Sequence, residues 1–199
     1  MAEEQTPVRR SLAPYVPSVL QRWELDAGSA ISQQIDGTLC LVDISGFTKL
    51  SERLARLGRI GAEELTEHLN SVFAEMLKLA YQRGGALLKF GGDALLLAFR
   101  GESHAQQACS AAVEMNGALR ASARRPTSVG RLGLRMSVGV HSGAIDLFRA
   151  GGSHHELIIT GPAASAVAAL EHEASPGEIL VGVTTQAALA AGSATTKKG

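Results

Sequence analysis

The sequence has neither a net charge nor a long apolar run, and each absence excludes a class of protein. Its 199 residues include 19 Lys and Arg against 19 Asp and Glu. Proteins that bind nucleic acid normally carry a basic excess, so we expect no nucleic-acid partner. No apolar run approaches the roughly 20 residues needed to cross a bilayer, so we expect no membrane span.

Cysteine is scarce, and the N-terminus has no apolar stretch. The two cysteines, Cys40 and Cys109, lie far apart in apolar segments without CxxC spacing, which predicts reduced core residues. The opening MAEEQTPVRR does not have the pattern of a signal peptide. Together these features predict a cytoplasmic protein. With 45% hydrophobic and 19% charged residues, the composition is that of a globular domain with a buried core.

Hydrophobic periodicity predicts an α+β domain. Residues 1–30 are interpreted as an N-terminal segment with a short amphipathic helix at 14–28, and residues 31–199 as one domain. The order strand, helix, helix, strand, strand, helix, strand is that of a ferredoxin-like sandwich. The expected strands are 37–43, 86–90, 94–99, 132–141, 144–149, 156–160 and 179–181, and the expected helices are 47–57, 62–82, 104–123, 163–171 and 184–191.

Two acidic residues stand where strands end. Asp43 closes an apolar strand and enters a glycine turn, and Asp93 lies at the tip of a Gly-Gly hairpin. Taken singly, Asp43 would be interpreted as a helix cap and Asp93 as a turn residue. If the two strands are neighbours, however, both carboxylates face one edge of the sheet. Mg²⁺ prefers such a pair when substrate phosphates and water complete its coordination.

Three motifs carry a family resemblance. They are LVDISGFTKL at 41–50, KFGGD at 89–93 and VGVHSG at 138–143. They resemble the class III adenylyl and guanylyl cyclase catalytic domain, and most of all the first catalytic half of bicarbonate-responsive soluble adenylyl cyclases and their bacterial relatives. The resemblance implies a ferredoxin-like α/β sandwich of the class III nucleotidyl cyclase type. It also implies conversion of ATP to cyclic AMP and pyrophosphate with two Mg²⁺ or Mn²⁺ ions per site.

The resemblance also implies roles for individual residues. Asp43 and Asp93 would bind both metal ions, with the backbone carbonyl of Ile44 as a further ligand. Lys89 matches a base-recognition lysine that in the soluble cyclases can instead serve bicarbonate, which makes bicarbonate a candidate ligand. The β- and γ-phosphates would be held by the backbone amides of Ser45, Gly46, Phe47 and Thr48.

Other family positions are altered. The transition-state asparagine falls at Ser165 and its arginine at Ala169, while the base-selecting residue falls at Ile158. A basic phosphate ligand falls at Ser137, although Arg135 is close by. The metal side is retained and the transition-state side is lost. The chain is therefore interpreted as the metal-binding half of a dimeric site, truncated at its C-terminal end, whose partner is a second cyclase domain in a hetero- or homodimer.

Two alternatives remain open. One is a catalytically impaired nucleotide-binding pseudo-cyclase, acting as a regulatory or dimerisation module, which Ala169 and Ile158 favour. The other is a diguanylate cyclase, whose signature also contains Gly-Gly-Asp, but here Ala94 and Leu95 follow that motif instead of Glu-Phe. The arginines between residues 120 and 125 are interpreted as a solvated helix end.

Overall fold

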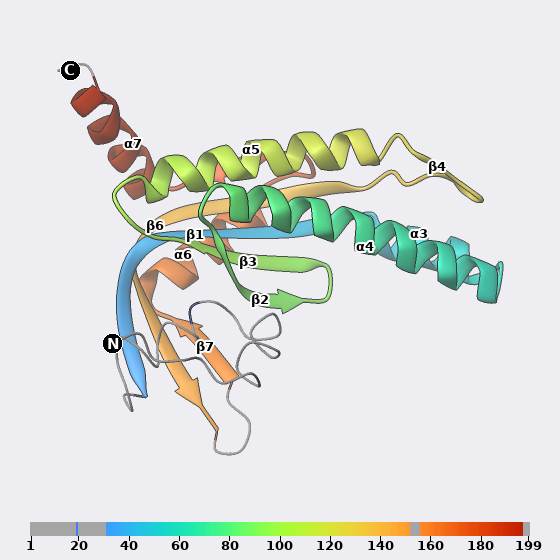
Figure 1. Ribbon diagram of the computed structural model, residues 1–199, viewed down its shortest axis with the longest axis horizontal. Helices are drawn as coiled ribbons and strands as arrows, with labels where there is room; N and C mark the ends of the chain where they lie inside the picture. The colour runs from blue at the N-terminus through green and yellow to red at the C-terminus, as the bar shows by residue number, and fades with distance from the viewer. Residues whose placement is uncertain (1–18, 20–30, 152–155, 197–199) are drawn as a thin grey trace, which may run out of the picture.

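The computed structural model describes Val19 and residues 31–151 and 156–196. Apart from Val19, the helix expected at 14–28 therefore lies outside the described residues. Figure 1 shows a strongly curved sheet, crossed by long helices, in which two strands bend together.

The main sheet has the strand order β2-β3-β1-β6-β7, and β8 pairs with β6 in parallel. All other pairings in this sheet are antiparallel. This topology confirms the expected α+β class. Its strands are β1 (Ser32–Ser45), β2 (Ala86–Gly91), β3 (Ala94–Phe99), β6 (Arg135–Ala150), β7 (Glu156–Thr160) and β8 (Ile179–Val181), and a separate two-stranded ribbon contains β4 (Pro126–Thr127) and β5 (Gly130–Arg131).

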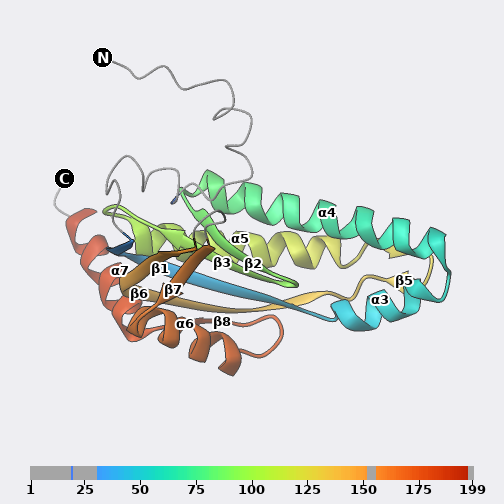
Figure 2. The same ribbon diagram turned by 90° about the horizontal axis from the view of Figure 1, so that it is seen from below.

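Helices cover both faces of the sheet, with α4 and α5 on one side and α6 on the other (Figure 2). Each face buries its own hydrophobic cluster, one under α3, α4 and α5 and one under α6. None of the helices in the described part of the chain has the length and apolarity to cross a membrane. The helices are α3 (Phe47–Ala55), α4 (Arg59–Gln82), α5 (His104–Ser122), α6 (Pro162–Glu173) and α7 (Val183–Thr196).

One strand prediction was wrong. The sequence predicted separate strands at 132–141 and 144–149, but β6 runs through the intervening residues without a break. Gly143 pairs with Gly37 of β1, so two glycines lie opposite each other where the paired strands continue. A Cβ at Gly37 would lie 2.4 Å from the carbonyl oxygen of Phe99. Gly37 in β1 therefore allows a close approach of the β3 backbone. Gly143 in β6 has room for a Cβ, which would lie 3.7 Å from the Cβ of Ala163, and it marks no turn.

Candidate active site

The two aspartates singled out by the sequence lie on neighbouring strands. Asp43, near the end of β1, is the direct register partner of Ala94 on β3, and Asp93 immediately precedes Ala94. The backbone N–H of Ile44 donates a hydrogen bond of 3.2 Å to the carbonyl oxygen of Asp93. Strand pairing thus brings the β2–β3 hairpin tip against the end of β1, as the metal hypothesis requires.

The electrostatics of this corner favour a cation. Burial raises the pKa of the Asp43 carboxyl above its usual value, and the negative charges of Asp93 and Glu171 raise it further. A bound divalent ion would offset both effects because it stabilises the ionised carboxylate. No group of three or more His, Cys, Asp or Glu in the described residues is arranged to hold a metal. Two carboxylates are nevertheless enough for Mg²⁺ when phosphates and water supply its other ligands.

The turn after Asp43 is built around a glycine that no other residue replaces easily. Gly46 precedes α3 with φ of 92°, in the left-handed region. A Cβ there would also lie 3.1 Å from the carbonyl oxygen of Gly133. No side chain caps the start of α3. The first-turn N–H groups of Phe47 and Thr48 lack partners within the helix, and they suit the negatively charged oxygens of a phosphate.

Lys89 occupies a different environment. It lies on β2 opposite Leu96, just after a register shift between Leu87 and Lys89, and it is exposed. Among the described residues its side chain has no hydrogen bond or ion pair. Its family role in base or bicarbonate recognition therefore stays a prediction.

Sequence reasoning missed Glu171. This residue, in the last turn of α6, accepts a 3.0 Å hydrogen bond from the hydroxyl of Ser137, the register partner of Asp43. A carboxylate thus approaches the corner where the family pattern expects a basic phosphate ligand. No motif in the sequence marks Glu171, because its position depends on how α6 packs across β6. A Cβ at Gly139 of β6 would lie 2.7 Å from the backbone nitrogen of Glu171.

Three of the residues that depart from the family pattern are accessible, whereas the fourth, Ser137, is buried. Ser165 and Ala169 lie one turn apart on α6, and both are exposed. Ile158 on β7 is 41% exposed and pairs with Phe148 of β6, which is exposed to the same degree. None of these three side chains is required to fill the core.

Comparison with known proteins identifies the family. The family model of the adenylate and guanylate cyclase catalytic domain matches residues 31–199. The chain belongs to this family.

Its relatives include both adenylyl and guanylyl cyclases. Adenylate cyclase type 10 of Homo sapiens is 25% identical over 178 residues, which are 85% of this chain and 11% of that protein. The Oryctolagus cuniculus protein of the same name is 33% identical over 93 residues, 46% of this chain and 6% of its own length. The chain thus spans only about a tenth or less of these curated relatives.

Solved structures agree on the fold. The adenylyl cyclase CyaB of P. aeruginosa superposes with a TM-score of 0.68 at 27% identity, covering 80% of this chain and 83% of that one. The guanylyl cyclase Cya2 gives the same TM-score at 26% identity, covering 80% of both chains. The expected cyclase resemblance and fold are therefore confirmed.

Proposed function

We propose that this domain is the metal-binding half of an adenylyl cyclase site, which converts ATP to cyclic AMP and pyrophosphate. The observation that carries the proposal is the meeting of Asp43 and Asp93 beside an uncapped helix start. The hydrogen bond from the Ile44 N–H to the Asp93 carbonyl fixes this meeting at the level of the backbone. Two carboxylates next to free amide donors suit a metal–triphosphate complex.

Each residue of this corner has a definite task. Asp43 and Asp93 hold two Mg²⁺ or Mn²⁺ ions, with the Ile44 carbonyl as a further ligand. When bound there, the ions supply charge neutralisation for the triphosphate and a lower pKa for the ribose 3′-hydroxyl. The backbone amides of Ser45, Gly46, Phe47 and Thr48 hold the β- and γ-phosphates in line for displacement at the α-phosphate.

Adenine is the preferred base in this proposal. The curated relatives are adenylate cyclases and CyaB is an adenylyl cyclase, whereas Cya2 is a guanylyl cyclase. Ile158 has no hydrogen-bonding side chain with which to select either base. Lys89, exposed on β2, is the remaining candidate for base contact. Bicarbonate, the alternative ligand that the resemblance to soluble cyclases implies for Lys89, would compete with the base for this lysine.

The transition-state groups come from a second cyclase domain. Ser165 and Ala169 lie on the exposed face of α6 where the family carries asparagine and arginine. Neither side chain supplies a positive charge for the α-phosphate, and an absent arginine of this kind can cost about 10³–10⁵ in rate. A partner domain with both groups completes the site.

Calorimetry of nucleotide binding tests the metal half directly. Mn²⁺ should strengthen ATP binding to the wild-type domain, and Asp43→Ala or Asp93→Ala should remove that dependence. Glu52→Ala, an exposed carboxylate on α3 without a bonded partner among the described residues, is the matched control. Unchanged Mn²⁺-ATP affinity in both aspartate variants, with their thermal unfolding intact, would refute the assignment.

A pseudo-cyclase is the second candidate function, and Ala169 favours it. In this case the domain binds metal and nucleotide but regulates or dimerises without turnover. Assaying cyclic nucleotide formation by this chain, alone and mixed with a cyclase domain that carries the asparagine and arginine, separates the two. Activity in the mixture supports the enzyme, whereas binding without activity in either sample supports the pseudo-cyclase.

A further inference from the structure

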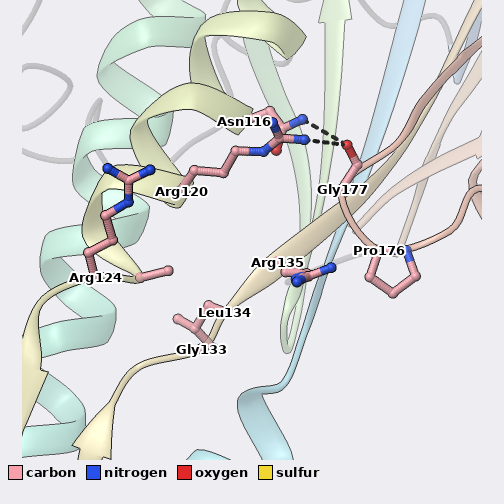
Figure 3. Close-up of a pocket in the computed structure, with 9 residues that line it drawn as sticks. Asn116, Arg120, Arg124, Gly133, Leu134, Arg135, Pro176 and Gly177 are labelled. Carbon is pink, nitrogen blue, oxygen red and sulfur yellow. Dashed lines mark hydrogen bonds between the residues drawn. The ribbon is translucent and has the colours of Figure 1, made fainter.

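A cavity of about 430 Å³ lies beside the candidate active site; its lining includes neither Asp43 nor Asp93, but its Arg135 is the register partner of Ser45. It opens between the C-terminal half of α5, the first residues of β6 and the loop that joins α6 to β8 (Figure 3). Three arginines line it: Arg120 from α5, Arg124 from the turn that follows α5, and Arg135 from β6. Its lining contains no acidic residue. We propose that this cavity binds a small molecule bearing two or more linked phosphates.

The fold, rather than a local excess of basic residues in the sequence, brings these arginines together. Asn116 and Arg120 lie four residues apart on one face of α5, and Arg124 follows in the turn after the helix ends at Ser122. Arg125, next in sequence, points elsewhere and donates a 3.3 Å hydrogen bond to the hydroxyl of Ser71. Arg120 and Arg124 are exposed, as expected of a solvated helix end, and they also line one cavity with the exposed Arg135.

The walls of this arginine cavity are tied together before any ligand binds. The carbonyl oxygen of Gly177 accepts hydrogen bonds from the side chains of Asn116, at 3.1 Å, and Arg120, at 3.0 Å (Figure 3). The N–H of Gly177 donates to the carbonyl of Met136 on β6 at 2.8 Å. One loop residue thus joins α5 to β6. Since these hydrogen bonds already hold the walls in place, ligand binding would carry little entropic cost for ordering them.

Gly177 itself is required by this arrangement. Its φ is 102°, and a Cβ would lie 3.4 Å from Nη2 of Arg120. Any other residue would therefore be strained in its backbone, although its Cβ would make only an ordinary contact with the arginine. The loop conformation thus depends on glycine at this position.

The charge of the cavity is uncompensated by protein groups. None of its three arginines has an ion pair among the described residues, and the bond from Arg120 to Gly177 is to a neutral acceptor. The C-terminal dipole of α5 is equivalent to only about half a negative charge, so it offsets little of the three positive charges. Nearby Glu178 instead accepts a hydrogen bond from the N–H of Ser175.

Phosphate is the ligand chemistry that this set fits best. A guanidinium presents parallel N–H donors that match two oxygens of one phosphate. The volume lies within the usual range for small-molecule sites, about 300–1,000 Å³, and exceeds what a single phosphate needs. Linked phosphates place several negative charges against three arginines at once. Inorganic pyrophosphate and a nucleoside triphosphate share this chemistry.

The test is calorimetric titration with inorganic pyrophosphate and, separately, with ATP, both in EDTA so that no metal bridges the ligand to the candidate active site. Arg124→Gln combined with Arg135→Gln removes two charges but leaves the Arg120 tie intact. We expect the double variant to weaken binding by about 10² or more, since each charge-assisted hydrogen bond contributes about 1.5–3 kcal/mol and 1.4 kcal/mol is a factor of ten.

Two control proteins make the result specific. Arg56→Gln with Arg100→Gln removes two exposed arginines elsewhere and should retain wild-type affinity. Asp43→Ala should also retain it, which separates this site from the metal site. Binding of pyrophosphate and ATP alike supports a polyphosphate site, and binding of ATP alone narrows the ligand to nucleotides. Absence of binding by wild type, unchanged affinity in the Arg124/Arg135 variant, or equal loss in the Arg56/Arg100 control would overturn the proposal.

Discussion

Under the proposed half-site function, introducing the two transition-state groups of the family pattern should raise the rate at which this chain forms cyclic AMP. Ser165→Asn and Ala169→Arg place an amide and a positive charge on α6, at sites that are already exposed. Surface substitutions of this kind usually change stability by less than about 0.5 kcal/mol, so the fold should tolerate both. A lost oxyanion-type donor costs about 10²–10³ in rate, and a lost arginine on a transferring phosphoryl group about 10³–10⁵.

The expected gain is smaller than the product of those factors. Effects of groups that act together are not additive, and Ile158 and Ser137 remain uncorrected. We therefore expect a rise of about 10²-fold in cyclic AMP formed per chain with Mn²⁺-ATP, from a wild-type rate near background. Ala168→Arg, which adds the same charge to an exposed neighbouring position on α6, should give no gain. Rapid turnover by the wild-type chain alone would refute the half-site reasoning. An inactive double variant that still binds Mn²⁺-ATP, and that a complementary domain also fails to activate, would refute it as well.

Three further predictions concern the site and its support. Because the pKa of Asp43 is raised in the folded state, ionisation of this carboxyl destabilises the fold. Asp43→Asn should therefore raise the Tm of the metal-free protein near neutral pH, by about 2–4 °C for each kcal/mol of destabilisation that it removes. The Tm values of wild type and variant should converge in acid, where the carboxyl becomes protonated. A wild-type Tm equal to that of the variant at every pH would contradict this. Glu171→Gln should lower the pKa of Asp43, measured by NMR titration, because it removes one like charge; an unchanged titration would show that the Glu171 charge is not felt there. Gly61→Ala should destabilise the domain by about 1–3 kcal/mol, since a Cβ would lie 1.9 Å from the carbonyl oxygen of Leu54. Gly117→Ala on α5, which has open space around it, should be neutral or stabilising. Equal thermal unfolding of both variants would count against the tight α3–α4 contact.

The sequence predicted the order of the elements well because their signals are local. Paired glycines at Gly91 and Gly92 marked the hairpin, and the strand at Glu156–Thr160 was located correctly. The continuous β6 was missed because glycine supports both turns and close strand approaches. Only the pairing of Gly143 with Gly37 distinguishes these cases, and that pairing joins residues far apart in the chain.

The candidate site likewise contains residues that local sequence signals predict and residues that only the folded structure brings together. Asp43 and Asp93 could be predicted because one lies near the end of a strand and the other at a hairpin tip, and pairing of adjacent strands brings these positions together. Glu171 could not, since its approach to Ser137 depends on the packing of α6 over β6. The arginine cavity was equally hidden, because Arg135 joins Arg120 and Arg124 only in the folded chain.

The two halves of the cyclase chemistry are supported by the fold to very different degrees. The proposed metal side depends on backbone features: the β1–β3 pairing, the Ile44–Asp93 hydrogen bond and the left-handed Gly46. Changes there disturb the sheet itself. The proposed transition-state positions are exposed side chains on α6, Ser165 and Ala169, which do not contribute to the buried core. A domain can therefore keep its structure and its metal corner while it loses catalytic groups. A TM-score of 0.68 to the adenylyl cyclase CyaB is compatible with either outcome, and in the proposed function the side chains at those two α6 positions decide between them.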